Sequence, residues 1–167
     1  MKTLIAFCST HGCTEKTANE LKDYLQNNVE LCNLKKDKIP SLELFDRVVV
    51  GGSIHAGQIQ KRVKEFCSKN EDILMQKELG LFICCMEEGE TAEKQLKDAY
   101  SEKLHRNAKI TAYFGGEFDF NKMNFFEKFI VKKVAHVTQS TSKIDHAAIL
   151  NFSVKLDKIF NPFLFLV

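Results

Sequence analysis

Short apolar runs and amphipathic segments alternate along the whole chain. The apolar runs have the length of strands buried on both faces, and we place five of them at residues 3–8, 29–34, 46–52, 79–86 and 110–114. The amphipathic segments repeat their apolar residues every three or four positions, which is typical of helices, and they lie at residues 14–25, 60–70, 91–104 and 144–159. The pattern therefore predicts an α/β protein.

The order of these elements predicts how the sheet is built. Strands that alternate with helices form a parallel sheet, because each connection must cross the sheet before the next strand begins. We expect five parallel strands in the order 2-1-3-4-5 between two layers of helices, a three-layer sandwich. Ligands of such sheets bind beyond the carboxyl ends of the strands. The chain has no linker or repeat, so residues 1–167 are expected to form a single domain.

Composition narrows the classes of partner and compartment. The 167 residues are 44% hydrophobic and carry a formal net charge of +2, so no strong field would steer the protein to nucleic acid. No apolar run reaches the length of a membrane-spanning helix, and the first residues lack the pattern of a signal peptide. The six cysteines have no spacing typical of zinc or haem sites, and no metal site is predicted. We expect a cytoplasmic protein.

Candidate chemistry begins directly after the first strand, in a turn of small polar residues. The turn consists of Ser9, Thr10, His11, Gly12, Cys13 and Thr14. Backbone N–H groups and small hydroxyls at a helix N-terminus favour an anion, so the turn predicts a site for one phosphate. It has neither the Lys-Ser/Thr pair of a triphosphate loop nor the glycine pattern of a dinucleotide loop. The alternative is a hydroxyl-rich helix cap without a ligand.

The pattern Ser/Thr-x-x-Gly-x-Thr from Ser9 to Thr14 resembles the loop that holds the phosphate of FMN in the flavodoxin family. The resemblance implies a flavodoxin-like fold, FMN as the cofactor, and all six residues of the turn at its phosphate. Gly12 would allow close backbone approach, and Thr14 would reach back with its hydroxyl. His11 stands where many flavodoxins carry a hydroxyl residue, so its contact would come from the backbone or the imidazole.

Two further loops are expected to hold the ring system of the flavin. They follow the third and fourth strands, and their candidate residues are Ser53, Ile54, His55, Ala56, Gly57, Cys85, Met86 and Glu87. Flavodoxins usually place Trp or Tyr against the ring, but this chain has no Trp and neither loop contains Tyr. His55 and Met86 are therefore the candidates to line it. For His55 the alternative is plain exposure to solvent.

Residues 115–143 form a long insertion between the fifth strand and the last helix. A helix is predicted within it, with an apolar stripe made of Met123, Phe126, Ile130, Val134 and Val137. Phe125 lies off the stripe, near lysines, and is expected to be exposed. The stripe either packs on its own domain, covers the flavin, or makes a peripheral contact through residues 121–137 with the inner face of the cell membrane.

The insertion and its flanks resemble one branch of the flavodoxin superfamily, the menaquinone-dependent protoporphyrinogen IX dehydrogenases. The resemblance rests on the glycine pair at 115–116, the Phe- and Lys-rich insertion, Ser53-Ile54 and Phe66. It implies an FMN-dependent oxidoreductase whose small-molecule substrates are a porphyrinogen and a quinone. A flavodoxin-type shuttle between redox proteins and a generic FMN quinone reductase are the alternatives. No catalytic residue is predicted, because the flavin carries the redox chemistry.

Overall fold

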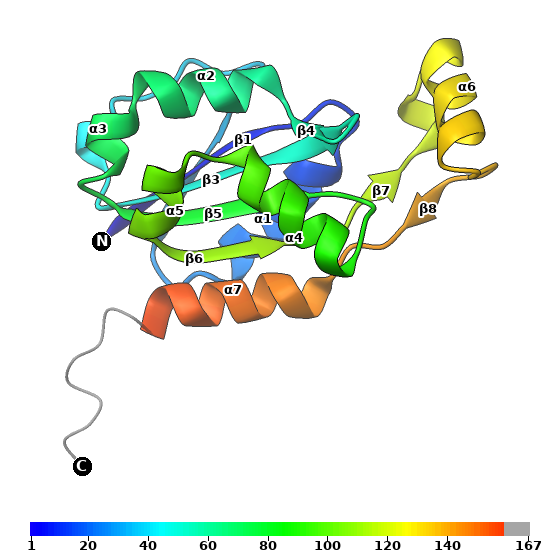
Figure 1. Ribbon diagram of the computed structural model, residues 1–167. Coiled ribbons are helices and arrows are strands. Elements are labelled where there is room, and N and C mark those ends of the chain that lie inside the picture. Colours follow the sequence, from blue (N-terminus) through cyan, green and yellow to red (C-terminus); the bar gives the residue numbers. More distant parts are fainter. Residues whose placement is uncertain (159–167) are drawn as a thin grey trace.

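The computed structural model describes residues 1–158. Its centre is a sheet in which parallel strands follow the order β2-β1-β3-β5-β6 (Figure 1). The strands are β1 (Lys2–Cys8), β2 (Asn28–Asn33), β3 (Arg47–His55), β5 (Glu78–Cys84) and β6 (Ala108–Tyr113). This is the predicted 2-1-3-4-5 order, because the short strand β4 (Gln58–Ile59) only turns back antiparallel on the end of β3. The expected α/β fold is confirmed.

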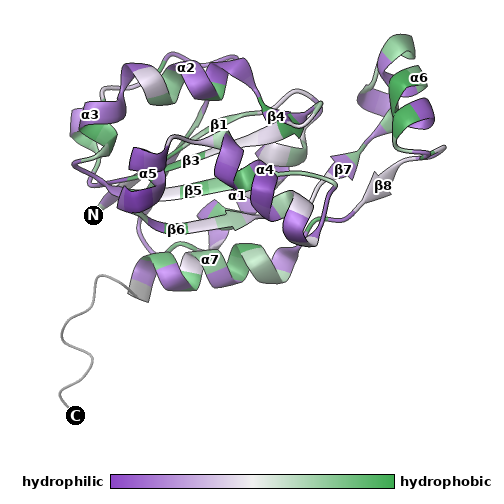
Figure 2. Cartoon of the chain, in the orientation of Figure 1, coloured by the Kyte–Doolittle hydropathy of each residue, from purple (hydrophilic) through white to green (hydrophobic). Residues whose placement is uncertain are grey.

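Helices cover both faces of the sheet (Figure 1). One face carries α1 (Cys13–Tyr24) and α7 (His146–Lys158), and the other carries α2 (Lys61–Lys69), α3 (Glu71–Leu74), α4 (Gly89–Ala99) and α5 (Glu102–Asn107). Alternate strand residues serve the two cores: Leu4 of β1 packs toward α2 and α4, whereas Ile5 packs toward α1 and α7. Figure 2 shows mainly hydrophobic residues along the central strands and a mixture of hydrophilic and hydrophobic residues along the helices around them.

The third strand continues to His55, beyond the end predicted at residue 52. The prediction that its glycines end the strand was wrong, because they allow close packing inside the sheet. A Cβ on Gly51 would lie 2.0 Å from the ring of Phe82 on β5, so only glycine leaves room for that ring. The longer strand places Ser53 and Ile54 on rigid backbone rather than in a loop.

The helix predicted over residues 91–104 is divided into α4 and α5. The break lies at Tyr100, whose buried hydroxyl is shared between the carbonyl oxygens of Val50 at 3.1 Å and Phe82 at 2.6 Å. Ser101 then begins α5 by accepting a hydrogen bond from the amide of Leu104. The last helix begins at His146, and its predicted end at residue 159 lies outside the described residues.

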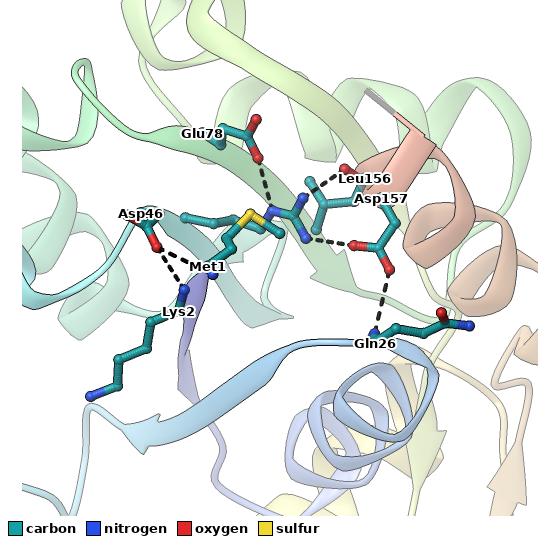
Figure 3. A network of polar contacts seen from close by, with 8 residues as sticks. Met1, Lys2, Gln26, Asp46, Glu78, Leu156 and Asp157 are labelled. Carbon is teal, nitrogen blue, oxygen red and sulfur yellow. Dashed lines mark hydrogen bonds and ion pairs between the residues drawn. The ribbon is translucent and has the colours of Figure 1, made fainter. Parts of the chain in front are cut away.

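A buried arginine lies at the amino ends of the strands, within the network drawn in Figure 3. The Arg47 guanidinium donates from Nε to Glu78 at 3.1 Å, from Nη1 to Asp157 at 2.7 Å, and from Nη2 to the carbonyl oxygen of Leu156 at 2.9 Å. These bonds join β3, β5 and α7. A charge without solvent exposure is tolerated here because carboxylates and a carbonyl oxygen surround it.

The insertion projects from the carboxyl end of the sheet as a two-stranded ribbon that carries a helix (Figure 1). Its elements are β7 (Glu117–Phe118), the 3₁₀ helix η2 (Phe120–Lys122), α6 (Phe125–Val134) and β8 (Thr141–Ser142). β7 and β8 pair antiparallel. The ribbon was not predicted, because two-residue strands leave no apolar pattern in the sequence.

The apolar stripe of α6 does not pack into the core, so that alternative was wrong. Phe126 and Val134 are 76% and 74% exposed, whereas Met123, which precedes the helix, is buried. Phe125 is 79% exposed, which confirms the prediction for that residue. Figure 2 shows the resulting hydrophobic surface on α6. None of the helices within residues 1–158 is long and apolar enough to cross a membrane.

The two ends of the insertion meet at one narrow point, which we call the neck. Gly115 has a φ of +70°, and a Cβ there would lie 1.8 Å from the carbonyl oxygen of Lys143. The amide of Lys143 donates to the oxygen of Gly116 at 2.8 Å, and the amide of Asp145 donates to that of Phe114 at 2.9 Å. The chain therefore leaves the sheet and returns to it at the same place.

Candidate functional site

The predicted phosphate turn joins β1 to α1 at the carboxyl end of the sheet. Gly12 caps α1 with a φ of +95°, a left-handed conformation that glycine adopts without strain. Its N–H donates to Ser9 Oγ at 3.1 Å, and this bond closes the turn. Ser9 is buried, so the turn is anchored rather than free. The free N–H groups at the start of a helix favour a negatively charged ligand at this point.

A chain of polar contacts fixes the turn against the end of β3. Thr14 Oγ1 lies 2.6 Å from Ser53 Oγ, and the amide of Ser53 donates to Gln60 Oε1 at 2.9 Å. Gln60 Nε2 in turn donates to Thr10 Oγ1 at 3.1 Å. Thr14 is fully buried, so its hydroxyl holds Ser53 in place. Gln60 was missed by sequence reasoning, because one amide before a helix gives no recognisable signal.

A cavity of about 660 Å³ opens beside the turn. The predicted residues that line it are His11, Cys13, Ser53, Ile54, His55, Ala56, Gly57, Cys85, Met86 and Glu87. The other predicted residues, Ser9, Thr10, Gly12 and Thr14, do not line it and belong to the turn. A polar turn and a wide cavity thus lie next to each other, as a ligand with a phosphate and a ring system would require.

The insertion supplies a further wall of the cavity. Most of its lining side chains are apolar. They are Met123, which directly follows η2, and Ile130, Val131 and Val134 of α6. None of these was among the predicted site residues. The apolar stripe in the sequence was the signal that could have indicated these residues, because an apolar helix face that is not covered by the core often lines a binding site.

A hydrogen bond and an ion pair hold the insertion against the phosphate turn and α1. His11 Nε2 lies 3.2 Å from Glu127 Oε2 of α6, and Lys16 Nζ lies 2.6 Å from a carboxylate oxygen of Glu117 on β7. The amide of Asn124 donates to Glu127 at 2.8 Å, and together with the nearby His11 it lowers the pKa of that carboxyl. The imidazole of His11 is therefore turned toward α6, away from the interior of the turn.

His55 lies opposite His11 at the mouth of the cavity. The centroids of the two rings are 6.3 Å apart. His55 is an exposed residue, yet desolvation by the atoms around its ring and the neighbouring His11 lower its pKa, so its imidazole is neutral at pH 7. The following turn contains Ala56 and Gly57, both at positive φ. A neutral imidazole and an open turn leave this side of the cavity accessible to a flat ring.

Three thiols line the cavity, and their surroundings shift them in different directions. Burial raises the pKa of Cys85 to about 11. The hydrogen bond between Cys13 and Cys84, together with burial, raises the pKa of Cys84 well above its ordinary value, and the same bond lowers the pKa of Cys13. All six cysteines are free. Within residues 1–158, no group of three or more His, Cys, Asp and Glu side chains is arranged to hold a metal ion.

The strand order, the turn at the start of α1 and the cavity beside it define a flavodoxin-like protein. A model of the family described as "Flavodoxin domain" matches residues 4–145, and the chain belongs to this family. Flavodoxin domains bind FMN, which agrees with the cofactor predicted from the turn.

Curated relatives and solved structures add to this membership. Over 73 residues the chain is 34% identical to the protoporphyrinogen IX dehydrogenase [quinone] of Escherichia coli K12. The match covers 42% of this chain and about two fifths of the relative, 40%. The branch suggested by the sequence is thus represented among its relatives.

Solved flavodoxins have the same fold as this chain. Oxidised flavodoxin 1 of Bacillus cereus aligns over 96% of this chain and all of its own, with a TM-score of 0.62 and 16% identity. A Fusobacterium nucleatum flavodoxin mutant bound to flavin mononucleotide aligns over 96% and 97% of the two chains, with a TM-score of 0.52 and 13% identity. At these identities the likeness establishes the fold alone.

Proposed function

We propose that the protein is an FMN-dependent oxidoreductase. The observation that carries the proposal is the anchored turn at the start of α1 beside a cavity of about 660 Å³. The residues fit the cofactor: the turn offers backbone N–H groups and the Thr10 hydroxyl, and no carboxylate lies between residues 9 and 14. When bound, FMN supplies the reversible uptake of electrons, which the side chains of this site do not provide.

The chain's own residues orient the flavin and exclude water. The turn from Ser9 to Thr14 takes the phosphate, while the loops with His55 and Met86 flank the ring. Met86 offers a polarizable thioether, and the neutral His55 adds no charge beside the ring. The apolar wall from α6 shields one side of the cavity from solvent.

The substrate pair that we propose is protoporphyrinogen IX as donor and a quinone as acceptor. The E. coli relative, matched over part of its length, carries that name. The cavity exceeds what a three-ring flavin alone would fill, and its remaining wall is apolar, which suits a large flat donor. Lys128, Lys132 and Lys133 on α6 supply positive charge for the propionate groups of such a donor or for anionic lipid.

A peripheral membrane contact through residues 121–137 belongs to the same proposal, because quinones reside in the lipid phase. Phe125, Phe126 and Phe129 are 79%, 76% and 56% exposed on α6, and the lysines of the helix flank them. Aromatic side chains beside basic ones suit the boundary between acyl chains and anionic headgroups. The protein would then act at the cytoplasmic face of the membrane.

A redox shuttle between proteins is the second candidate, and the flavodoxin-like fold is compatible with it. The net charge of +2 does not, because flavodoxins that dock on basic partners are typically acidic. A generic FMN quinone reductase is the third candidate, and it differs from the main proposal only in needing no porphyrinogen.

Anaerobic turnover tests the proposal. FMN is added to the purified protein, unbound flavin is removed, and protoporphyrinogen IX is supplied with and without a menaquinone analogue while porphyrin fluorescence is recorded. Fluorescence that rises only with quinone present is the expected result. Flavin binding without porphyrin formation would favour the shuttle or the generic reductase. Failure to bind FMN would overturn the whole proposal. Gly12→Ala serves as the comparison variant. A Cβ at this φ is strained and meets Lys122, so the variant should bind FMN more weakly and form less porphyrin.

A further inference from the structure

One lysine of the insertion reaches back over the phosphate turn. Lys122 Nζ lies 2.8 Å from the position that a Cβ on Gly12 would occupy. Lys122 belongs to η2, more than a hundred residues further along the chain, so this approach depends on how the insertion is folded. We propose that Lys122 binds the phosphate of FMN and thereby fastens the insertion over the cofactor, an inference that rests on the proposed function.

The position of Lys122 is set by its own short helix. Its amide donates to the carbonyl oxygen of Asp119 at 3.0 Å, and the Asp119 carboxylate receives the amide of Asn121 at 3.1 Å. The Lys122 ammonium lies 3.8 Å from the same carboxylate, beyond hydrogen-bond distance. Its side chain is 49% exposed. The backbone is thus fixed, while the ammonium group is free to take a stronger acceptor.

A cation beside the turn would strengthen its hold on a dianionic phosphate monoester. Its own donors are neutral N–H and hydroxyl groups, and its residues carry no lysine or arginine. Lys16, on the first turn of α1, is already held by Glu117 at 2.6 and 2.9 Å. The imidazole of His11 is directed to Glu127. Of these three groups, Lys122 is the one beside Gly12 that makes no hydrogen bond to a carboxylate, and ionised partners form the stronger hydrogen bonds.

The same contact couples cofactor and insertion. The insertion rests on the core partly through the His11–Glu127 and Lys16–Glu117 pairs, in each of which one side chain is mostly buried and the other is more exposed. A phosphate bound on both sides, by the turn and by Lys122, adds a contact that exists only when FMN is bound. FMN thus helps to position the apolar wall of α6 that faces the rest of the cavity.

Flavin titrations separate the effect of Lys122 from that of the fold. Dissociation constants for FMN and for riboflavin, which lacks the phosphate, are measured by fluorescence quenching for the wild type, Lys122→Met, Lys122→Arg and Lys109→Met. Lys109→Met removes the same charge from an exposed site at the other end of β6. We expect Lys122→Met to weaken FMN about tenfold and to leave riboflavin unchanged, since a charged hydrogen bond is lost. Lys122→Arg should restore most of the affinity.

The salt dependence and the insertion itself give independent readouts. FMN affinity of the wild type should fall more steeply with ionic strength than that of Lys122→Met. FMN should also slow amide exchange in residues 117–142 of the wild type but not of Lys122→Met. An FMN affinity of Lys122→Met within twofold of the wild type would overturn the inference and leave the proposed function standing. An equal loss of FMN and riboflavin affinity would also overturn it. A wild type that binds no FMN would refute both.

Discussion

The two ends of the sheet carry charged clusters that are built in opposite ways. At the amino ends, the guanidinium of Arg47 is fully buried and each of its three partners belongs to the core or to α7. At the carboxyl ends, the pairs His11–Glu127 and Lys16–Glu117 are partly exposed and join the core to the insertion. The first cluster links strands and a helix of the core to one another, whereas the second lies beside the cavity, where a ligand can reach its polar groups.

The difference follows from what each environment does to a charge. A buried charge that loses its partner stays buried and unsolvated, so the native state tolerates little change there. An exposed pair that is broken is rehydrated at small cost. Contacts at the carboxyl ends of the strands, where the site lies, can therefore change with little loss of global stability. Substitutions at each end of the sheet test this difference separately.

The largest expected effect is at the buried cluster. Arg47→Met would leave the carboxylates of Glu78 and Asp157 facing an apolar side chain, and we expect the free energy of unfolding to fall by about 3 kcal/mol. Chemical denaturation measures this loss, with Lys109→Met as the surface control. FMN affinity of the folded variant should equal that of the wild type. A loss below about 1 kcal/mol would mean that the hydrogen-bond network of Arg47 contributes little to the stability of the folded state.

At the site end, Glu117→Gln should have a much smaller effect on global stability. The Lys16–Glu117 pair is half exposed at the lysine, so its removal should cost less than about 1 kcal/mol in the same denaturation experiment. Limited proteolysis should nevertheless cleave residues 117–142 faster in this variant, because one tie of the insertion is gone. Unchanged cleavage would show that the insertion is held by other contacts.

The smallest effect that we expect is a pH dependence of the insertion. Hydrogen bonding from the Asn124 amide, together with the nearby His11, lowers the pKa of Glu127, so the folded state prefers its ionised form. This contribution is complete above the ordinary carboxyl pKa of 4.5 and is lost as the pH falls through the lower folded value. Protection factors for amide exchange in α6, which correct for the intrinsic effect of pH on exchange, should therefore fall below about pH 4.5.

Glu127→Gln provides the control for that pH dependence. Glutamine keeps the capping geometry with Asn124 but does not titrate, so the protection factors in α6 of this variant should show no step in this range. A step of equal size in the variant would assign the pH effect to another carboxyl group.

The fold could be predicted from local patterns in the sequence, whereas the candidate site could be predicted only in part. The apolar runs and the turn from Ser9 to Thr14 are contiguous, so they could be recognised without the structure. The division at Tyr100 could not, because it depends on the carbonyl oxygens of Val50 and Phe82, which are distant in the chain. Gln60 and Lys122 escaped for the same reason: a single amide or lysine gains its meaning only from the turn against which it is folded.

The neck at Gly115 has a consequence for how such a protein can diversify. Because the chain departs and returns at one place, the strand register and the packing of α7 do not depend on the length of what lies between. Lengthening a loop whose two ends are held together costs little conformational entropy, since the cost of loop closure grows only slowly with loop length. A lineage can therefore lengthen, shorten or exchange this segment as a unit while the sheet stays constant, so the wall that the segment adds to the cavity can change without any change in strand order.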